Sequence, residues 1–532
     1  MKKYWPLIAI LFLGLILRFY HNLDISLWHD EAFSALMIRY PWQEMFVRLG
    51  LDVHPPAYYV GLRLWHYIFG DTLLSLRGFS ILFGTGTIWA GWMFCKEAFK
   101  NEKAAIWAAL LIAVNPFQLQ YVTEARMYTF GAFFALLAGY FLAKGLNSQK
   151  ELHEAQGQNM PDSPDVLKHR KASRWAYFGF TLSLIVIIYT HYYLFFTAAA
   201  LGVYGLVYLY FHHDADKSAR YTKYIPLILS YIVAGLAFLP WLKTFLFQYR
   251  QVQAGYWISQ MDRWSIPSTF WDMLIGFQRD MGVANTYRWL IILTLFSIFF
   301  LVYFLKKTQS FHKWLVVMAI AAPFGGALLF ALLAKLKGSS SSVYLDRYFL
   351  FASLYYSIAL AVWLKEIKVK WLSIGLLVFY VFFNLYAVRV YWHNLNVESK
   401  PGMAAAAKFL AANVEPKQHV FVGTTFEFFN YNYYWKTGFA TPVRPLVFTG
   451  GRDKANQMSH VDGVAMLTDA DLLPDFAKAV TTGDTVWLIW TYAFGSNKPQ
   501  LPLNWVQIDQ KEYSDVRPYA GTVIYVTEYK VN

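Results

Sequence analysis

Long apolar runs dominate this sequence and leave few folds open to it. Eleven stretches of about twenty residues, separated by polar segments, are apolar enough to cross a bilayer as helices. A composition of 57% hydrophobic and 20% aromatic residues also argues against a water-soluble protein of 532 residues. The sequence therefore predicts a polytopic α-helical membrane protein. The runs lie at about residues 5–21, 72–94, 104–121, 127–144, 174–190, 192–211, 223–243, 288–305, 313–335, 344–364 and 371–391.

The first run resembles a signal peptide, because Lys2 and Lys3 precede it. Arg18-Phe19-Tyr20-His21 follows the run, where a cleavage site would need small residues. We therefore expect residues 5–21 to remain as the first transmembrane helix. The single cysteine, Cys95, excludes an internal disulfide and a thiolate metal site.

Basic loops indicate which side of the membrane each segment occupies. Lysine and arginine gather in the loops after alternate runs, and such loops are usually cytoplasmic. We therefore place these loops and the N-terminus in the cytoplasm, and the remaining loops outside. The formal net charge of +14 then reflects topology rather than nucleic-acid binding. The basic loops lie at about 96–103, 144–174, 217–223, 306–313 and 365–370.

The composition changes near residue 392 and predicts two domains, a membrane domain over 1–392 and a small α/β domain over 393–532. By the same charge rule the second domain is extracytoplasmic. Its role, acceptor recognition or simple shielding, stays open. Its expected elements are helices near 401–413 and 468–480 and strands at 419–422, 485–490, 505–509 and 522–528.

Five short polar clusters all fall in segments that the charges place outside. A pore or pump would hold its ionisable groups near the middle of the membrane. Groups at helix ends and in loops on one face are typical of an enzyme with an active site at the membrane surface. The clusters are Trp28-His29-Asp30-Glu31, Asp52-Val53-His54-Pro55-Pro56, Thr123-Glu124-Ala125-Arg126, Thr190-His191-Tyr192-Tyr193 and Tyr344-Leu345-Asp346-Arg347-Tyr348.

Asp30 has two interpretations. It follows Trp28 just beyond the first run, where a partly desolvated carboxylate can act as a general base. Alternatively, Asp30 is the N-cap of a helix over about 32–38. Its neighbour Glu31 either joins the chemistry or orients the groups around it.

Asp52 and His54 lie in a loop that Pro55-Pro56 makes rigid, just before an expected interfacial helix over about 55–69. His54 can bind phosphate, a sugar hydroxyl or, together with a carboxylate, a metal ion. A solvated loop histidine is the alternative.

Three arginines lie near the outer ends of the runs. An ion pair with Glu124 would explain Arg126, and snorkelling toward the membrane surface would explain Arg77 or Arg347 singly. Three arginines beside carboxylates are better explained by an anionic ligand such as phosphate. They would stabilise a phosphate that leaves the anomeric carbon of a sugar, while a carboxylate activates the acceptor hydroxyl.

These residues resemble a known family in order and spacing over about the first 390 residues. The family is that of the GT-C membrane glycosyltransferases, family 39, which includes protein O-mannosyltransferases and bacterial aminoarabinose transferases. The motifs are Asp30-Glu31, DVHPP at 52–56 followed by AYY, Ser75-Leu76-Arg77 before FSILFG, EARMY at 124–128, THYY at 190–193 and DRY at 346–348.

The resemblance implies a GT-C catalytic domain over 1–392 and an inverting transfer on the external membrane face. It implies a polyprenyl-phosphate sugar donor and a hydroxyl acceptor on a protein, a lipid or an envelope glycan, with Asp30 as the base. The candidate catalytic residues are then Asp30, Glu31, Asp52, His54 and Glu124, and those near the lipid phosphate are Arg77, Arg126, His191, Tyr344, Arg347 and Tyr348.

One motif departs from the family. Val53-His54 stands where aminoarabinose transferases have Glu-Lys before Pro-Pro, so their metal ligand has no counterpart here. We expect that no cofactor is required, and a divalent metal stays open. Two other classes remain as alternatives. A transporter predicts ionisable groups within the spans, and a non-catalytic scaffold for envelope glycan assembly predicts that replacement of Asp30 is silent.

Overall fold

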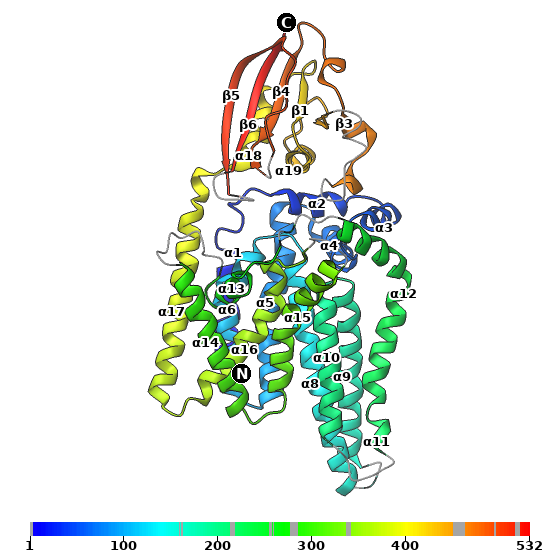
Figure 1. Cartoon of the computed structure of the whole chain (residues 1–532), viewed down its shortest axis with the longest axis vertical. Helices are drawn as coiled ribbons and strands as arrows, with labels where there is room; N and C mark the ends of the chain where they lie inside the picture. The colour runs from blue at the N-terminus through cyan, green and yellow to red at the C-terminus, as the bar shows by residue number, and fades with distance from the viewer. Residues whose placement is uncertain are drawn as a thin grey trace.

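A bundle of long helices carries a sheet domain at one end (Figure 1). The structure is a computed structural model. It describes residues 4–532 except 159, 161–162, 213–218, 255–257, 259, 277–285, 337–341, 451–462, 494–495 and 517–521.

Eight helices among the described residues are long and apolar enough to cross a membrane, so the chain is a multi-pass membrane protein. They are α5 (Leu73–Phe99), α8 (Tyr128–Gln158), α10 (Leu194–Phe211), α12 (Ile225–Ala254), α14 (Thr286–Lys307), α15 (Lys313–Leu336), α16 (Leu350–Glu366) and α17 (Lys370–Leu395).

The other three predicted runs also form helices. α6 (Glu102–Val114) and α7 (Pro116–Val122) meet at a 53° bend and together would make a ninth span. α1 (Trp5–Phe19) is about 22 Å long, which is shorter than a hydrocarbon core of about 30 Å. α9 (Pro164–Ile188) begins with a charged segment. By length and composition the described residues therefore give eight or nine spans, and the count of eleven stays a prediction.

Short helices form a layer between the bundle and the sheet domain (Figure 1). The helix predicted over about 55–69 is present as α4, which buries Tyr58 and Tyr59 and exposes Leu64 and Ile68, and its location in the membrane interface stays a prediction. The 3₁₀ helix η2 holds the last polar cluster at the start of α16. The short elements of the membrane part are α2 (His29–Met37), α3 (Trp42–Leu51), α4 (Ala57–Phe69), α11 (Ala219–Thr222), α13 (Ser265–Ile275) and η2 (Asp346–Phe349).

The sheet domain has six strands in the order β3-β2-β1-β4-β6-β5. The first four strands of that order are parallel, while β6 is antiparallel to both β4 and β5. Its strands are β1 (His419–Val422), β2 (Leu446–Phe448), β3 (Leu472–Leu473), β4 (Thr485–Thr491), β5 (Trp505–Asp515) and β6 (Thr522–Val531). Its helices are α18 (Gly402–Asn413) and α19 (Thr425–Thr437), with 3₁₀ helices η3 (Val397–Ser399), η5 (Val464–Met466), η6 (Asp469–Asp471) and η7 (Phe476–Lys478).

Most predicted elements of this domain are confirmed, and one is wrong. The helix expected near 468–480 is replaced by η6, β3 and η7, because Pro474 would break a helix at its centre. The aromatic-rich helix α19 was not predicted from the sequence. The signal for α19 was Thr424 followed by Glu427, a capping pattern, and the Thr424 side chain does accept a hydrogen bond from the Glu427 backbone N–H.

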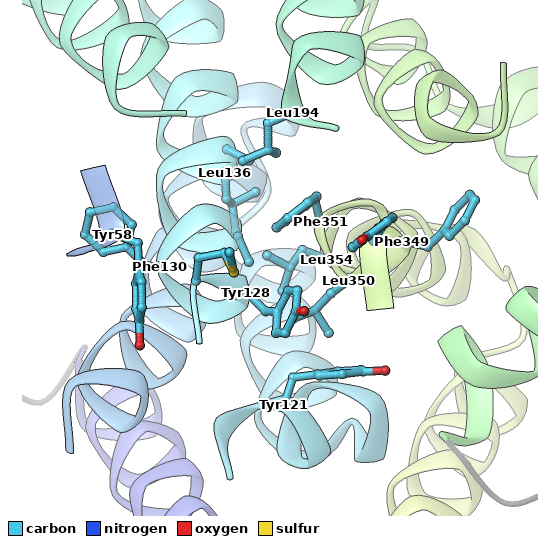
Figure 2. Close-up of a cluster of buried hydrophobic side chains, with 14 of the residues drawn as sticks. Tyr58, Tyr121, Tyr128, Phe130, Leu136, Leu194, Phe349, Leu350, Phe351 and Leu354 are labelled. Carbon is cyan, nitrogen blue, oxygen red and sulfur yellow. The ribbon is translucent and has the colours of Figure 1, made fainter. Parts of the chain in front are cut away.

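One apolar core joins the bundle to the sheet domain. It runs from the membrane helices through α2 to Phe429 of α19 and Ile489 of β4. Figure 2 shows part of this core, where Tyr128 lies close to Leu350. A smaller cluster around Phe421 and Trp505 packs separately within the sheet domain. The sheet domain is therefore attached to the bundle through buried apolar contacts.

Candidate active site

Asp30 lies in the first turn of α2. The helix begins at His29, and its N-cap is Trp28, which makes no side-chain capping bond. The N-cap interpretation of Asp30 is therefore wrong. The Asp30 carbonyl accepts a hydrogen bond from Ser34 Oγ at 3.1 Å, while the carboxylate is 21% exposed. The side chain is thus available to partners outside its own helix.

Two arginines face the Asp30 carboxylate. Arg347 Nη1 of η2 lies 3.3 Å from Asp30 Oδ2, and Arg126 Nε, from the turn before α8, lies 3.9 Å from the same oxygen. Burial alone would raise the pKa of Asp30, but the attraction of Arg126 and Arg347 outweighs it and lowers the pKa to about 2. Asp30 is therefore an ionised carboxylate in this state.

Arg126 is fixed by further contacts. Its Nη1 donates to the Asp30 carbonyl at 3.3 Å, to Ser34 Oγ at 3.3 Å and to the Tyr59 hydroxyl at 3.2 Å. Its Nη2 lies 3.4 Å from His54 Nε2. Sequence reasoning missed Ser34 and Tyr59, although Tyr59 belongs to the AYY that follows DVHPP. These contacts hold the guanidinium of Arg126 beside Asp30.

Asp52 and His54 form a pair on the other side of Arg126. His54 Nδ1 lies 2.8 Å from Asp52 Oδ2. Burial alone would raise the pKa of Asp52, but the charge of His54 and its hydrogen bond lower it. Asp52 therefore orients the His54 ring, whose other nitrogen faces the guanidinium.

His191 and Tyr348 pack together behind this pair. Their ring centres are 4.6 Å apart, and the His191 ring lies 6.1 Å from that of His54. The backbone N–H of Tyr193 donates to His191 Nδ1 at 3.1 Å. Burial lowers the pKa of His191 well below its ordinary value, so the ring is neutral. The structure thus brings His191 and Tyr348 close to the Asp30 group.

Glu31 and Arg77 are held away from solvent. Arg77 Nε and Nη2 each lie 2.8 Å from a Glu31 oxygen, and both side chains are fully buried. Arg77 also donates to the carbonyls of Asn22, Ile25 and Ser26, and Glu31 Oε1 accepts from the Ala125 N–H at 2.9 Å. Both side chains are therefore engaged in holding the loop before α2 against α5.

Glu124 and Tyr344 complete the predicted set. The Glu124 side chain is buried, and its carbonyl accepts a hydrogen bond from Ser80 Oγ at 2.7 Å. The Tyr344 hydroxyl lies 2.5 Å from Thr269 Oγ1 and donates to the Ser265 carbonyl at 3.0 Å, which attaches it to α13. Of the predicted residues, Asp30, Asp52, His54, Arg126 and Arg347 are linked by the contacts above.

The arrangement of acidic and imidazole groups bears on metal binding. In the described part of the chain, no three His, Cys, Asp or Glu side chains come close enough together to hold a metal ion. The positive charge at the candidate site instead comes from the two guanidinium groups beside Asp30.

A family model matches one segment of the chain. Residues 53–153 match the model described as dolichyl-phosphate-mannose-protein mannosyltransferase. The matched segment includes His54, Arg77, Glu124 and Arg126. No curated protein sequence matches the chain.

Two solved structures share the fold over nearly the whole chain. ArnT from Cupriavidus metallidurans in the apo state is 12% identical, with a TM-score of 0.58 and coverage of 99% of this chain and 98% of that chain. The same protein bound to undecaprenyl phosphate is 12% identical, with a TM-score of 0.58 and 98% coverage of both chains. The expected GT-C fold, similar to that of family 39, is confirmed.

Proposed function

We propose that this chain is an inverting glycosyltransferase that moves a sugar from a polyprenyl-phosphate donor to an acceptor hydroxyl on the external membrane face. The observation that carries the proposal is the Asp30 carboxylate beside the guanidinium groups of Arg126 and Arg347. The site lies at the end of the membrane bundle, beneath the sheet domain (Figure 1). The ArnT complex with undecaprenyl phosphate supports a donor of this class for the fold.

In the proposed ground state the donor phosphate binds Arg347 and Arg126. Guanidinium groups bind phosphate oxygens by charge-assisted hydrogen bonds. Because both groups contact Asp30 in the free protein, the phosphate competes with Asp30 for them. As the arginines turn to the phosphate, the pKa of Asp30 rises from its low value, and the carboxylate becomes a better proton acceptor. Donor binding thereby activates the base.

In the proposed reaction the acceptor oxygen attacks the anomeric carbon from the face opposite the phosphate. The bond from that carbon to the phosphate oxygen breaks, and its electron pair stays on the phosphate. The acceptor hydroxyl proton passes to Asp30. The arginines stabilise the charge on the leaving phosphate, so we propose that neither a general acid nor a metal ion is required. Asp52 and His54 hold Arg126 in place.

The test compares Asp30→Asn with Asp24→Asn, a control in the same loop whose carboxylate is 54% exposed and lies 2.5 Å from His21 Nδ1. Both purified proteins receive membrane lipids from the host in a buffer with EDTA. Native mass spectrometry follows the bound lipid, and loss of sugar from the donor measures transfer. We expect Asp30→Asn to lower the transfer rate by about 10²–10⁴-fold and to retain donor binding, while Asp24→Asn behaves as wild type.

An Arg347→Ala protein provides the second comparison. We expect it to lose the co-purifying polyprenyl phosphate or its glycoside, whose mass also identifies the sugar. Normal transfer by Asp30→Asn would remove Asp30 from the mechanism. A wild-type protein that neither binds such a lipid nor consumes it would overturn the proposal and favour a transporter or a scaffold.

A further inference from the structure

Two helices of the sheet domain contact the segment that leads to Asp30. The Leu27 N–H donates to the Tyr434 hydroxyl of α19 at 2.8 Å. The same hydroxyl lies 3.2 Å from Ser26 Oγ, which also accepts a hydrogen bond from the Ala404 N–H of α18 at 3.3 Å. Residues 26 and 27 are therefore bonded to the sheet domain only three residues before Asp30.

The membrane domain holds the same segment from the other side. Arg77 of α5 donates to the carbonyls of Ile25 at 2.9 Å and Ser26 at 3.4 Å. Arg77 and Tyr434 bond the Ser26 carbonyl and the Leu27 N–H, the two sides of one peptide group, so both domains hold the segment before α2.

Aromatic side chains of α19 extend this contact along α2. The His29 ring lies 4.7 Å from that of Phe426 and 5.4 Å from that of Phe429. Phe429 also meets Phe33 edge to face at 6.4 Å, and Phe33 meets Tyr59 in the same way at 6.4 Å. These rings flank Asp30 on its own helix and lead to Tyr59, which bonds Arg126.

We propose that α19 of the sheet domain positions Asp30 for proton transfer, with Tyr434 and Phe429 as the positioning residues. The inference rests on the proposed function. Neither residue touches the reacting atoms; each acts through residues 26–33. Since a misplacement of about 1 Å can cost a factor of about 10² in rate, a small shift at the start of α2 is enough to slow the reaction.

The Tyr434 hydroxyl has a specific physical task. Leu27 is buried, so its N–H needs a partner within the protein. Tyr434→Phe keeps the ring and removes this acceptor, which leaves a buried donor unpaired. The first turn of α2 then gains freedom, while the contacts of Arg126 with Tyr59 and His54 keep its guanidinium in place for the donor phosphate.

The test compares Tyr434→Phe with Tyr433→Phe in the full-length protein. Tyr433 is the adjacent residue of α19, and its hydroxyl also crosses to the membrane domain, where it donates to the Asp71 carbonyl at 3.0 Å. Transfer kinetics give kcat and the donor KM, and hydrogen exchange reports on residues 22–34. For Tyr434→Phe we expect kcat to fall about tenfold or more, the donor KM to stay within about twofold, and exchange of the Leu27 amide to accelerate. Tyr433→Phe should leave all three near wild type.

A second pair of variants, at Phe429, controls for a folding defect in Tyr434→Phe. Phe429→Leu keeps an apolar side chain against His29 and Phe33, and Phe429→Ala removes it, so kcat should fall in the alanine protein and recover in the leucine protein. Equal kcat and equal exchange in Tyr434→Phe and Tyr433→Phe would overturn the positioning role. If the wild-type protein transfers no sugar and Tyr434→Phe still accelerates exchange of the Leu27 amide, the proposed function is overturned. The contact between α19 and the segment before α2 then stands.

Discussion

Asp30 and Glu31 are neighbours in sequence with opposite environments. Successive residues on a helix point about 100° apart, so one carboxylate meets Arg126 and Arg347 while the other is buried against Arg77. The Asp30 carboxylate, which faces two arginines, is partly exposed. The ion pair between Glu31 and Arg77 is closed to solvent. A ligand can therefore compete for the first group and not for the second.

Removal of Arg77 should damage stability rather than donor binding. Arg77→Met removes the cation beside the buried Glu31 carboxylate, so we expect a loss of about 3–5 kcal/mol in the free energy of unfolding. The double change with Glu31→Gln should recover part of this loss. Thermal unfolding in detergent measures the effect, with Arg347→Met as the control that loses transfer and retains most of its thermal stability. An Arg77→Met protein that is stable but fails to bind donor would place Arg77 at the lipid phosphate.

Motif spacing located the polar residues of the site but not their partners. Asp30, His54, Arg126 and Arg347 were all found from the sequence, because each lies in a polar cluster between apolar runs. The choice of partner for each arginine depends on helix orientation and on contacts between residues far apart in the chain. Sequence position alone therefore groups Arg77 with Arg126 and Arg347, although the structure pairs Arg77 with Glu31.

At the scale of elements, apolar periodicity found the long helices and missed the helix that contacts the site. The membrane runs are long and uniform, so their positions follow from composition. α19 is short and aromatic, and its composition favours strand as much as helix. What makes it helical is the Thr424 cap together with burial of most of its side chains, some of them against α2, and only the first of these is visible in the sequence.

α19 also carries a buried acid that should make stability depend on pH. The Glu427 side chain is 2% exposed, and burial together with the charge of Asp515 raises its pKa to about 8. The unfolded value is 4.5, so between these values the folded chain holds a proton that the unfolded chain has released. Stability contributed by this group is complete below pH 4.5 and is lost as pH rises toward 8.

Thermal unfolding at pH 5.5 and pH 8 tests this in wild type and Glu427→Gln. As pH rises, we expect the melting temperature of wild type to fall more than that of the variant. The difference should be about 2–4 °C for each kcal/mol of unfolding free energy that is lost when Glu427 must ionise. The exposed Glu398→Gln serves as the matched control and should follow wild type. Identical pH dependence in wild type and Glu427→Gln would mean that Glu427 is ionised in the folded protein.

At the scale of the whole molecule, the sheet domain and the basic loops lie at opposite ends. The connections from α14 to α15 and from α16 to α17 lie far from the sheet domain (Figure 1). These connections lie within the lysine-rich segments 306–313 and 365–370, which include the adjoining helix ends. From the positive-inside rule we predict that Asp30 and the sheet domain lie on the external face. The sidedness follows from charge alone, since the fold is the same in either orientation.

Labelling of single introduced cysteines tests that orientation directly. The native Cys95 is buried and should give little background. Leu503 of the sheet domain is fully exposed, and Lys150 is exposed near the far end of α8. We expect a membrane-impermeant maleimide to label Leu503→Cys in intact cells and to label Lys150→Cys only after the membrane is opened. The reverse pattern would place the candidate site in the cytoplasm. The acceptor and the donor headgroup would then have to be on the cytoplasmic side as well.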